Sequence, residues 1–592
     1  MNLVNLTING KAVSVPSGTK ILEAAKQVGV KIPSLCQMKI DEIGFTNECA
    51  SCRVCMVSAG RKLVPACGTM VKEGMVVNTN TPEALKYRKN VVELLLSDHP
   101  QDCYTCTKCG SCGLQDIAVQ LGIKKIRFEG ERLEKSKDNS SFSIMRDNDK
   151  CILCRRCETM CTEVQTVGVL SGVNRGFNTV VGTFFNADMM DTECTFCGQC
   201  VSVCPTGALM EKSEIDKLDQ AKKEGKYIVV QTAPAVRAAL GEEFGMPIGT
   251  SVTGKMVAAL KRLGFNKVYD TNFAADLTIM EEATELVHRI KEGGQLPMIT
   301  SCSPGWVNYA EYFYGDLLGH LSSCKSPHEM EGAIIKSYFA EKKGLDPKNI
   351  FVVSIMPCTA KKYEKERPEN ASKEGLKDVD CVLTTRELAR LIKRSGIDFR
   401  RLPDEEFDQD LLGEYTGAGV IFGVTGGVME AALRTAYFTI TGKEHDLITF
   451  KEVRGFDGLK EAEIDLNGTK IKVAVAHGMK NAKPLLDDIR AGKSPYTFIE
   501  IMGCPGGCIN GGGQPFVKPC FLPNEDANIL DTYKEKRAKV LYSEDEKQVL
   551  RQSHRNTQIQ QLYKDYLGEP NSHKAHELLH TSYHARERYP EK

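Results

Sequence analysis

Cysteines spaced for metal binding are the most informative residues in this chain. The pattern C-x2-C-x2-C-x3-C occurs twice between residues 151 and 204. Three thiolates this close together can bind one iron–sulfur cubane, and in two-cluster arrangements the fourth cysteine of each run binds the other cluster. The spacing predicts electron transfer through two [4Fe–4S] clusters, with ligands Cys151, Cys154, Cys157 and Cys204 for one and Cys194, Cys197, Cys200 and Cys161 for the other. Structural zinc fits poorly, because its C-x2-C pairs lie farther apart.

Near the N-terminus five cysteines compete for four ligand positions. A C-x2-C pair with one cysteine on each side is similar to the plant-type [2Fe–2S] pattern, although the first gap is longer here. The stretch also resembles the [2Fe–2S] domain of hydrogenases and of the large iron–sulfur subunit of complex I, whose C-R-x-C-x-V signature falls on residues 52–57. The resemblance implies Cys36, Cys52, Cys55 and Cys67 as ligands. Cys49 is then a spare thiol, and the alternative is that it displaces Cys52.

A histidine precedes the next cysteine group, which comprises Cys103, Cys106, Cys109 and Cys112. A lone histidine at such a place is more often a cap or a surface residue. The pattern H-x3-C-x2-C-x5-C, however, resembles a [4Fe–4S] site with one histidine and three cysteine ligands in the same two families. The resemblance implies His99, Cys103, Cys106 and Cys112 as ligands, and Cys109 as the remaining thiol. Imidazole in place of thiolate makes a site less anionic and should raise its potential.

Three more cysteine loops are far apart in sequence: TSCSPGW (300–306), MPCTAKKYE (356–364) and EIMGCPGGCINGGGQP (500–515). We expect them to assemble one metal centre at a domain interface, and the glycines of the last loop to let backbone approach a bulky inorganic ligand. The loops look like the signature motifs of [FeFe]-hydrogenases. That family binds an H-cluster, in which one cysteine sulfur bridges a [4Fe–4S] cubane to a di-iron unit carrying CO, cyanide and a dithiolate. The resemblance covers essentially the whole chain and implies reversible hydrogen oxidation and proton reduction.

The resemblance also implies roles for single loop residues. Cys358, Cys504 and Cys508 match cubane ligands, and Cys508 matches the bridging cysteine. The first loop departs from the commoner TSCCP pattern, because Cys302 matches the proton donor and Ser303 stands where the family has a cubane ligand. Thiolate is the better iron ligand. Either Ser303 ligates through oxygen, or the loop shifts and Cys302 becomes the ligand; the sequence leaves both open.

Further residues are implied to surround the di-iron unit or to carry protons. Lys361 matches a lysine that gives a cyanide a charge-assisted hydrogen bond, and a surface lysine is its alternative. The residues expected to line the pocket are Met356, Met502, Ala233 and Pro234. The residues that match the proton path of the family are Cys302, Glu282, Ser322, Glu285 and Arg289. Glu282, Glu285 and Arg289 also share one face of a predicted helix, so a solvated salt-bridge face is the alternative.

Hydrophobic patterning predicts the elements that position these residues. Asn9-Gly10 predicts a β-hairpin turn, and residues 21–28 an amphipathic helix. From residue 213 to about 520, β-rich segments alternate with amphipathic helices, which favours an α/β domain with largely parallel sheets. Strands are predicted at 227–231, 350–355, 418–424 and 472–477, and helices at 252–263, 274–291 and 385–394.

The chain therefore divides into five parts of a multidomain α/β and α+β protein. The resemblance implies a β-grasp, plant-type [2Fe–2S] ferredoxin-like domain (1–78), a one-His three-Cys [4Fe–4S] segment (79–120), a two-[4Fe–4S] ferredoxin-like domain (139–212), an α/β hydrogenase catalytic domain (213–525) and a helical, small-subunit-like C-terminal belt (526–592). The charged residues 130–141 are expected to form a solvated linker. We attribute the four histidines between residues 573 and 584 to the belt rather than to a metal site.

Composition excludes several other classes. Lys plus Arg equals Asp plus Glu at 77 each, so no basic excess favours nucleic acid. Without a signal peptide or an apolar run long enough to span a bilayer, we expect a cytoplasmic protein with no membrane span. Its 24 cysteines then serve as metal ligands rather than disulfides.

The sequence says less about the electron partner. GVTGG at 423–427 lacks Rossmann spacing and context, so a nicotinamide or flavin would be bound by another subunit. The resemblance to the hydrogenase subunit of multimeric, electron-bifurcating complexes of anaerobes implies flavin/NAD-binding and [2Fe–2S] partner subunits, ferredoxin, and maturation proteins for the di-iron centre. It also implies one [2Fe–2S] cluster, three accessory [4Fe–4S] clusters and a fourth in the H-cluster. The rival functions are an electron-transfer subunit of a complex I-like assembly and a hydrogen-sensing or cluster-scaffold homologue without turnover.

Overall fold

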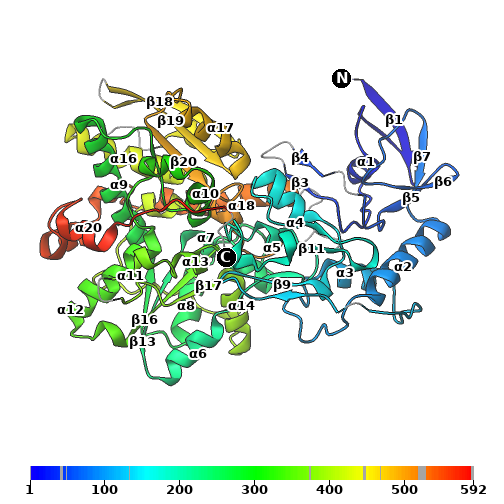
Figure 1. The fold of residues 1–592 in the computed structure, drawn as a ribbon, viewed down its shortest axis with the longest axis horizontal. Helices are drawn as coiled ribbons and strands as arrows, with labels where there is room; N and C mark the ends of the chain where they lie inside the picture. The colour runs from blue at the N-terminus through cyan, green and yellow to red at the C-terminus, as the bar shows by residue number, and fades with distance from the viewer. Residues whose placement is uncertain are drawn as a thin grey trace.

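The computed structural model describes residues 2–40, 45–47, 50–132, 134–372, 375–444, 449–466, 469–517 and 529–588. Cys49, expected to be a spare thiol, and the boundary expected at 525/526 lie outside these residues. The N-terminal iron–sulfur part lies on one side of the molecule and the larger α/β part on the other, with residues 139–212 between them (Figure 1). None of the helices in the described part combines the length and apolar character needed to cross a bilayer.

The N-terminal part contains a five-stranded sheet in the order β2-β1-β7-β5-β6. The predicted hairpin is confirmed: β1(Leu3–Ile8) and β2(Lys11–Pro16) pair antiparallel, and Asn9 and Gly10 both take the positive φ of its turn. Helix α1(Ile21–Gln27) is confirmed as well, with its apolar face buried. The other strands are β5(Met56–Ala59), β6(Lys62–Pro65) and β7(Met75–Asn78).

The core of this sheet continues into the next segment. Val92 of α2(Pro82–Ser97) and Leu114 and Ile117 of α3(Gly113–Gln120) belong to the same buried cluster as residues of the sheet. In addition, Arg88 Nε donates to the Met56 carbonyl over 2.9 Å. Residues 1–78 and 79–120 therefore share one hydrophobic core.

The expected solvated linker at 130–141 is wrong in its second half. Strand β8(Lys137–Asp138) joins β9(Ile144–Asp147) and β12(Leu209–Glu211) in a three-stranded sheet. Asp138 is buried, and its carboxylate accepts a hydrogen bond from the Met189 backbone N–H over 2.9 Å and lies 3.4 Å from Arg146. A charge run looks solvated in sequence, but here distant partners compensate for the loss of water.

Two four-stranded sheets form the centre of the α/β part. All strands of the first are parallel, in the order β14(Lys267–Asp270), β13(Tyr227–Thr232), β16(Ile350–Met356) and β17(Cys381–Thr384). The second has the order β15(Met298–Ile299), β20(Phe498–Met502), β19(Thr469–His477) and β18(Leu459–Leu466), with only β18 antiparallel to its neighbour. This largely parallel arrangement and the predicted helices, α8(Thr253–Arg262), α9(Asn272–Glu292) and α14(Thr385–Arg394), are confirmed.

The cysteine loops leave these sheets at equivalent places. They follow the carboxyl ends of β15, β16 and β20, and Ala233-Pro234 follows the carboxyl end of β13. In parallel sheets the carboxyl ends lie at one edge, where ligands bind. The topology therefore places the 300–306 and 500–515 loops together at one sheet, and the 356–364 loop joins them from the other sheet.

The strand predicted at 418–424 is wrong, because this segment begins as helix α15(Gly417–Ile421). Thr416 caps the helix by accepting from the Ala418 N–H over 3.2 Å. The helix packs closely on α9 at Gly419: a Cβ there would lie only 2.5 Å from the Asn272 carbonyl oxygen, so no side chain fits at this position. The apolar run is buried on all sides by neighbouring elements, which sequence periodicity cannot distinguish from a buried strand.

The C-terminal segment is helical, as expected from composition, and follows the α/β part (Figure 1). Its elements are α18(Ile529–Lys547), α19(Thr557–Leu562) with the π-helical turn η16(Tyr563–Leu567), and α20(His573–Leu579). Buried ion pairs attach it, including Asp545 to Arg434 at 3.0 Å and Glu544 to Arg237 at 3.3 Å.

Candidate metal centres and proton path

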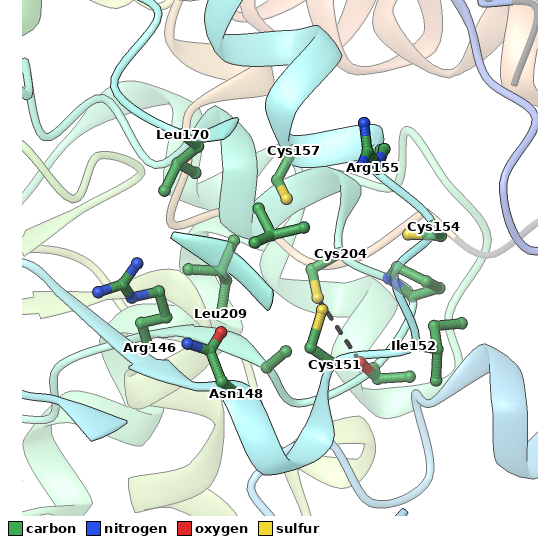
Figure 2. A pocket seen from close by; sticks show the side chains of 14 residues that line it. Arg146, Asn148, Cys151, Ile152, Cys154, Arg155, Cys157, Leu170, Cys204 and Leu209 are labelled. Atoms are coloured by element: carbon green, nitrogen blue, oxygen red, sulfur yellow. Dashed lines mark hydrogen bonds between the residues drawn. The ribbon is translucent and has the colours of Figure 1, made fainter. Parts of the chain in front are cut away.

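Four cysteines surround a cavity in the two-cluster part (Figure 2). They are Cys151, Cys154, Cys157 and Cys204, the set predicted for the first [4Fe–4S] cluster. The wall between them is largely apolar, with Ile152, Leu170 and Leu209. The fourth cysteine of the first run, Cys161, is not part of this lining. The structure thus brings together the crossed set, and its thiols suit a cubane.

Cys161 lies instead with the second run. Burial and then the charge of Cys161 raise the pKa of the Cys194 thiol. Burial and then the charges of Cys197, Cys194 and Cys161 raise the pKa of the Cys200 thiol. Cys161 is therefore near Cys194 and Cys200 of the second run, as the second predicted ligand set requires.

The second site lies directly against the loops of the α/β part. A Cβ on Gly198 would lie 2.2 Å from Thr359 Oγ1 and 3.1 Å from Gly512 Cα. Gln199 Nε2 also donates to the Asn510 carbonyl over 3.0 Å. Because the segment between the predicted ligands Cys197 and Cys200 packs directly on the loops of the α/β part, the two sites are a short distance apart, as electron transfer requires.

The predicted [2Fe–2S] ligands also converge. The Cys36 thiol is hydrogen bonded to those of Cys52 and Cys67, and Cys55 is hydrogen bonded to Cys67. All four are buried. Leu35, the neighbour of Cys36 in sequence, packs against Gly113: its methyl carbon is 3.3 Å from the position that a Cβ on Gly113 would take. The Gly113 N–H donates to the Pro205 carbonyl over 2.8 Å, so this site approaches the Cys204 end of the first cubane site.

The histidine site is more open. One cavity is lined by His99, Cys103, Cys109 and Cys112. Cys106 faces Gly207 instead: its Sγ is 2.8 Å from the position that a Cβ on Gly207 would take. The charge of Cys106 nonetheless acts on both Cys103 and Cys112. His99 Nδ1 is buried and has no hydrogen-bond partner among the described residues, as a metal-binding nitrogen would before its metal is bound. Cys109 is exposed.

The three loops of the α/β part bring their thiols together. Burial and then the charges of Cys358, Cys197 and Cys508 raise the pKa of the Cys504 thiol. Burial and then the charge of Cys358 raise the pKa of Cys508 to about 12. Three cysteines predicted to bind the cubane of an H-cluster therefore lie near one another in a partly buried site, which also borders Cys197 of the neighbouring cluster site. This donor set suits iron–sulfur chemistry.

The glycines of the last loop have a different role from the one expected. A Cβ on Gly511 would lie 2.2 Å from the Pro357 carbonyl oxygen, and one on Gly512 would lie 2.5 Å from the Cys197 carbonyl oxygen. Gly507 has a φ of +91°, and its Cβ would meet the Thr425 backbone nitrogen at 2.6 Å. These glycines thus permit close packing between protein backbones, which the sequence alone could not distinguish from access to a ligand.

Cys302 and Ser303 face different neighbours. Ser303 Oγ accepts a hydrogen bond from the Gly503 N–H over 3.1 Å, directly before Cys504. Burial and then the charges of Glu282 and Cys508 raise the pKa of the Cys302 thiol well above its usual range. Cys302 therefore lies on the side of the predicted proton path, and Ser303 on the side of the cubane thiols.

Lys361, predicted to contact a cyanide, is buried at the first turn of α13(Lys361–Glu364). Its Nζ donates to the Cys302 carbonyl over 3.2 Å and to Glu364 Oε2 over 2.7 Å. Burial alone would lower the pKa of Lys361, but the carboxylate of Glu364 raises it. The lysine is therefore charged and fixed in place, and it is not a surface residue.

Glu364 and His328 were not identified from the sequence. His328 Nε2 lies 2.6 Å from Glu364 Oε2, and both side chains are buried. Burial alone would raise the pKa of Glu364, but the charges of Lys361 and His328 lower it to about 2. The i, i+3 spacing of Lys361 and Glu364 could have indicated their ion pair. His328 is brought in by α11(Pro327–Ile334), and its position depends on the tertiary structure.

The residues expected to line the pocket lie at strand ends. Met356 and Met502 are the last residues of β16 and β20, and Ala233 and Pro234 begin α7(Pro234–Arg237) after β13. All four are buried. Met502 belongs to the same apolar cluster against which Cys302 packs.

The outer part of the predicted proton path is connected by hydrogen bonds. Ser322 Oγ donates to Glu285 Oε2 over 3.0 Å, and Ser322 is close enough to Glu282 to lower its pKa. Arg289 Nη2 donates to Glu285 Oε1 over 2.6 Å. Glu282 is only 2 % exposed, whereas Glu285 and Arg289 reach the surface. The alternative of a solvated salt-bridge face therefore holds for Glu285 and Arg289, but it is wrong for the buried Glu282.

Glu282 has an unusual protonation state for a carboxyl. Burial and then the nearby charge of Glu285 raise its pKa to about 8. Its Oε2 finds no hydrogen-bond partner among the described residues. A carboxyl that holds a proton at neutral pH can donate it or exchange it.

Family comparisons agree with this arrangement. Residues 226–512 match the family described as iron only hydrogenase large subunit, C-terminal domain, and residues 531–586 match iron hydrogenase small subunit. Residues 1–82 match a 2Fe-2S iron-sulfur cluster binding domain, and residues 88–127 the NADH-ubiquinone oxidoreductase-G iron-sulfur binding region. Residues 150–208 match a 4Fe-4S dicluster domain.

Individual proteins are similar over much of the chain. The NADP-reducing hydrogenase subunit HndD of Solidesulfovibrio fructosivorans is 51% identical over 99% of this chain and 100% of its own length. Iron hydrogenase 1 of Clostridium pasteurianum is 42% identical over 98% of this chain and 99% of its own length. Among solved structures, a variant of [FeFe]-hydrogenase HydA1 from Chlamydomonas reinhardtii has a TM-score of 0.55 at 43% identity, covering 62% of this chain and 98% of that one.

Proposed function

The chain belongs to the [FeFe]-hydrogenase family, and from this premise we propose that it oxidises hydrogen and reduces protons reversibly at an H-cluster held by its three convergent loops. The observation that carries the proposal is the meeting of Cys358, Cys504 and Cys508 in one partly buried site that adjoins both Cys302 and Cys197. Proton carriers approach this site from one side and electron carriers from another. A hydrogenase requires both.

We assign the cubane ligands to Cys358, Cys504, Cys508 and Ser303, and the proton-donating thiol to Cys302. The assignment is supported by the hydrogen bond between Ser303 Oγ and the Gly503 N–H, which holds the hydroxyl beside Cys504. It is also supported by Cys302, whose carbonyl binds Lys361 and whose thiol neighbours Glu282. The loop therefore needs no shift.

When bound, the di-iron unit supplies the bond-making and bond-breaking chemistry of hydrogen. The protein supplies the proton relay: Cys302 holds a proton at Sγ, and Glu282 exchanges one at its carboxyl. Ser322 Oγ passes it to Glu285, which Arg289 holds at the surface. Lys361, fixed by Glu364, presents an ammonium for an anionic ligand. Glu282 and Lys361 are buried, which limits the access of water to this route.

For electrons we propose one [2Fe–2S] cluster in a β-grasp domain and three accessory [4Fe–4S] clusters, in addition to the cubane of the H-cluster. Two branches, at Cys36 and at His99, are expected to meet the first ferredoxin-like cubane at its Cys204 end. The hydrogen bond from Gly113 to Pro205 and the position of Cys106 beside Gly207 support this order. The second cubane then feeds the H-cluster through Cys197.

We further propose that the chain works in the cytoplasm of an anaerobe with flavin/NAD-binding and [2Fe–2S] partner subunits and with ferredoxin, in an electron-bifurcating complex. The similarity to a subunit of an NADP-reducing hydrogenase supports this proposal. Maturation proteins are expected to supply the di-iron unit.

Infrared spectroscopy and turnover test the proposal together. The anaerobically matured protein should show stretching bands of bound CO and cyanide and should evolve hydrogen from reduced methyl viologen. The CO and cyanide bands without turnover would indicate a hydrogen sensor. Accessory-cluster signals with neither those bands nor turnover would indicate an electron-transfer subunit or a cluster scaffold.

A further inference from the structure

A residue of the C-terminal segment reaches the outer end of the proton path. The backbone of His580 forms an antiparallel bridge with that of Cys324. On either side of this bridge, the Lys325 N–H donates to the Leu579 carbonyl and the Thr581 N–H donates to the Ser323 carbonyl, both over 2.8 Å. The imidazole of His580 is therefore held in place beside Glu285 by backbone pairing.

Three possible metal ligands of different chemistry meet here. One ligand atom each from Glu285, Cys324 and His580 lies within 4.8 Å of the other two. Cys324 Sγ is 3.9 Å from Glu285 Oε2, while the other oxygen, Oε1, binds Arg289. Glu285 Oε2 accepts hydrogen bonds from Ser322 Oγ and from the N–H and Oγ of Ser323, so a cation on Oε2 would replace one of these hydrogen bonds while the ion pair with Arg289 is kept. Cys324 has no role in the proposed relay or in cluster binding.

The hydrogen bonds of His580 indicate which nitrogen a metal would bind, in exchange for a hydrogen bond to the Ser323 hydroxyl. Its Nε2 lies 3.0 Å from Glu281 Oε2, and its Nδ1 lies 2.8 Å from Ser323 Oγ. The buried carboxylate of Glu281 is anchored in turn by Tyr563 and by the Asn571 N–H. A carboxylate that accepts the N–H of one nitrogen and leaves the other nitrogen for a metal is the usual support of a metal-binding histidine.

We propose that Glu285 Oε2, Cys324 Sγ and His580 Nδ1 form a binding site for Zn²⁺. A carboxylate, a thiolate and an imidazole match the ligand preference of this borderline-soft cation, and three protein ligands leave a fourth position for water. Tetrahedral zinc places its ligand atoms about 3.5 Å apart, so the three side chains need to approach by only about 1 Å. Binding breaks the Cys324 S–H bond, forms a Zn–S bond and releases one proton to solvent.

The site has a route to solvent. His576, which is exposed, stacks on His580 with ring centroids 4.0 Å apart, and Ser323 and Glu285 are partly exposed. Of the four histidines between residues 573 and 584, only His580 belongs to the proposed site. The other ligands come from distant parts of the chain, which explains why the histidine-rich sequence by itself does not indicate it.

Zinc at this site should inhibit hydrogen turnover, and this consequence rests on the proposed function. Glu285 accepts from Ser322 and contacts the surface, so a cation on its Oε2 would occupy the atom that receives the proton. Inhibition should therefore be reversible by a chelator and should leave the clusters intact.

Binding and turnover should be measured separately on the holoenzyme under anaerobic conditions, with ZnCl₂ as the probe. Zinc K-edge absorption should reveal one sulfur scatterer at about 2.3 Å together with nitrogen and oxygen scatterers. C324A should lose the sulfur scatterer, and H580Q should weaken zinc binding at least about tenfold in equilibrium dialysis. H576Q is the matched control and should bind like the wild type.

Different results would refute the zinc site and the proton relay through Glu285. A zinc spectrum without sulfur, or unchanged binding in both C324A and H580Q, would refute the site; C324S replaces C324A if the alanine variant fails to fold. Zinc bound with a sulfur ligand but without inhibition would establish the site and refute the relay through Glu285. Unchanged iron content and EPR signals during the titration confirm that zinc has not displaced iron.

Discussion

Replacing Glu282 by glutamine should separate proton transfer from folding. With a pKa of about 8, roughly nine in ten Glu282 carboxyls hold a proton at pH 7. Glutamine is neutral and of similar shape, but it cannot exchange a proton. Loss of a positioned acid–base group costs at least about a hundredfold in rate, which corresponds to about 3 kcal/mol in the activation barrier.

The same substitution should not lower the free energy of unfolding near neutral pH, although it lowers the rate of turnover. The pKa of Glu282 is raised from 4.5 to about 8, so its favourable contribution is complete below pH 4.5 and is lost as the pH rises through 8. The full loss is about 5 kcal/mol at about 1.4 kcal/mol per pKa unit. Glutamine has no such loss, so E282Q should unfold no earlier than the wild type between pH 7 and 9.

Hydrogen evolution from reduced methyl viologen, measured from pH 6 to 9, is the assay. Glu331 of α11 is the matched control, because it is also fully buried and burial raises its pKa well above the usual range. It is not part of the path, so E331Q should keep wild-type turnover. The difference between the infrared spectra of the wild type and E282Q should contain a protonated-carboxyl band at pH 7 that is lost above about pH 8, whereas the band of Glu331 is common to both and cancels. Near-wild-type turnover of E282Q with full iron content would refute the relay.

Substitutions at four further residues test the metal sites and the support of Lys361. C508A should abolish turnover and leave the EPR signals of the accessory clusters; retained activity in the matured variant would contradict the bridging role. C67S should remove the [2Fe–2S] signal and impair electron exchange with a partner subunit, while turnover with methyl viologen persists; loss of that turnover in an otherwise intact protein would show that the domain supports catalysis directly. S303A should lower the iron content of the H-cluster, and S303C should retain it; equal iron in S303A and the wild type would exclude ligation by the hydroxyl. E364Q should shift the cyanide infrared bands and slow turnover by releasing Lys361, and unchanged bands would contradict a positioning role.

Local patterns predicted the regular elements well where one chemical reason dominated. The hairpin at Asn9-Gly10 follows from the positive φ of its turn, and the helices at 252–263 and 385–394 follow from amphipathic spacing. The segment at 418–424 was predicted wrongly because burial on all sides removes the periodicity that separates a helix from a strand. Asp138 was predicted to be solvated because its partners, Arg146 and Met189, are not evident from the local composition.

The spacing of the short cysteine runs was enough to predict that Cys204 joins Cys151, Cys154 and Cys157, because it restricts the ligand sets that the backbone can form. The sequence by itself also indicated the family, through loops whose residue types are rarely combined. Only the tertiary structure decided the different environments of Cys302 and Ser303, the support of Lys361 by Glu364 and His328, and the approach of His580 to Glu285. These contacts join residues that are up to hundreds of positions apart in the sequence. Local sequence patterns cannot predict whether such residues meet in the folded protein. The carboxyl edges of the parallel strands and the backbone pairing of the C-terminal segment create them.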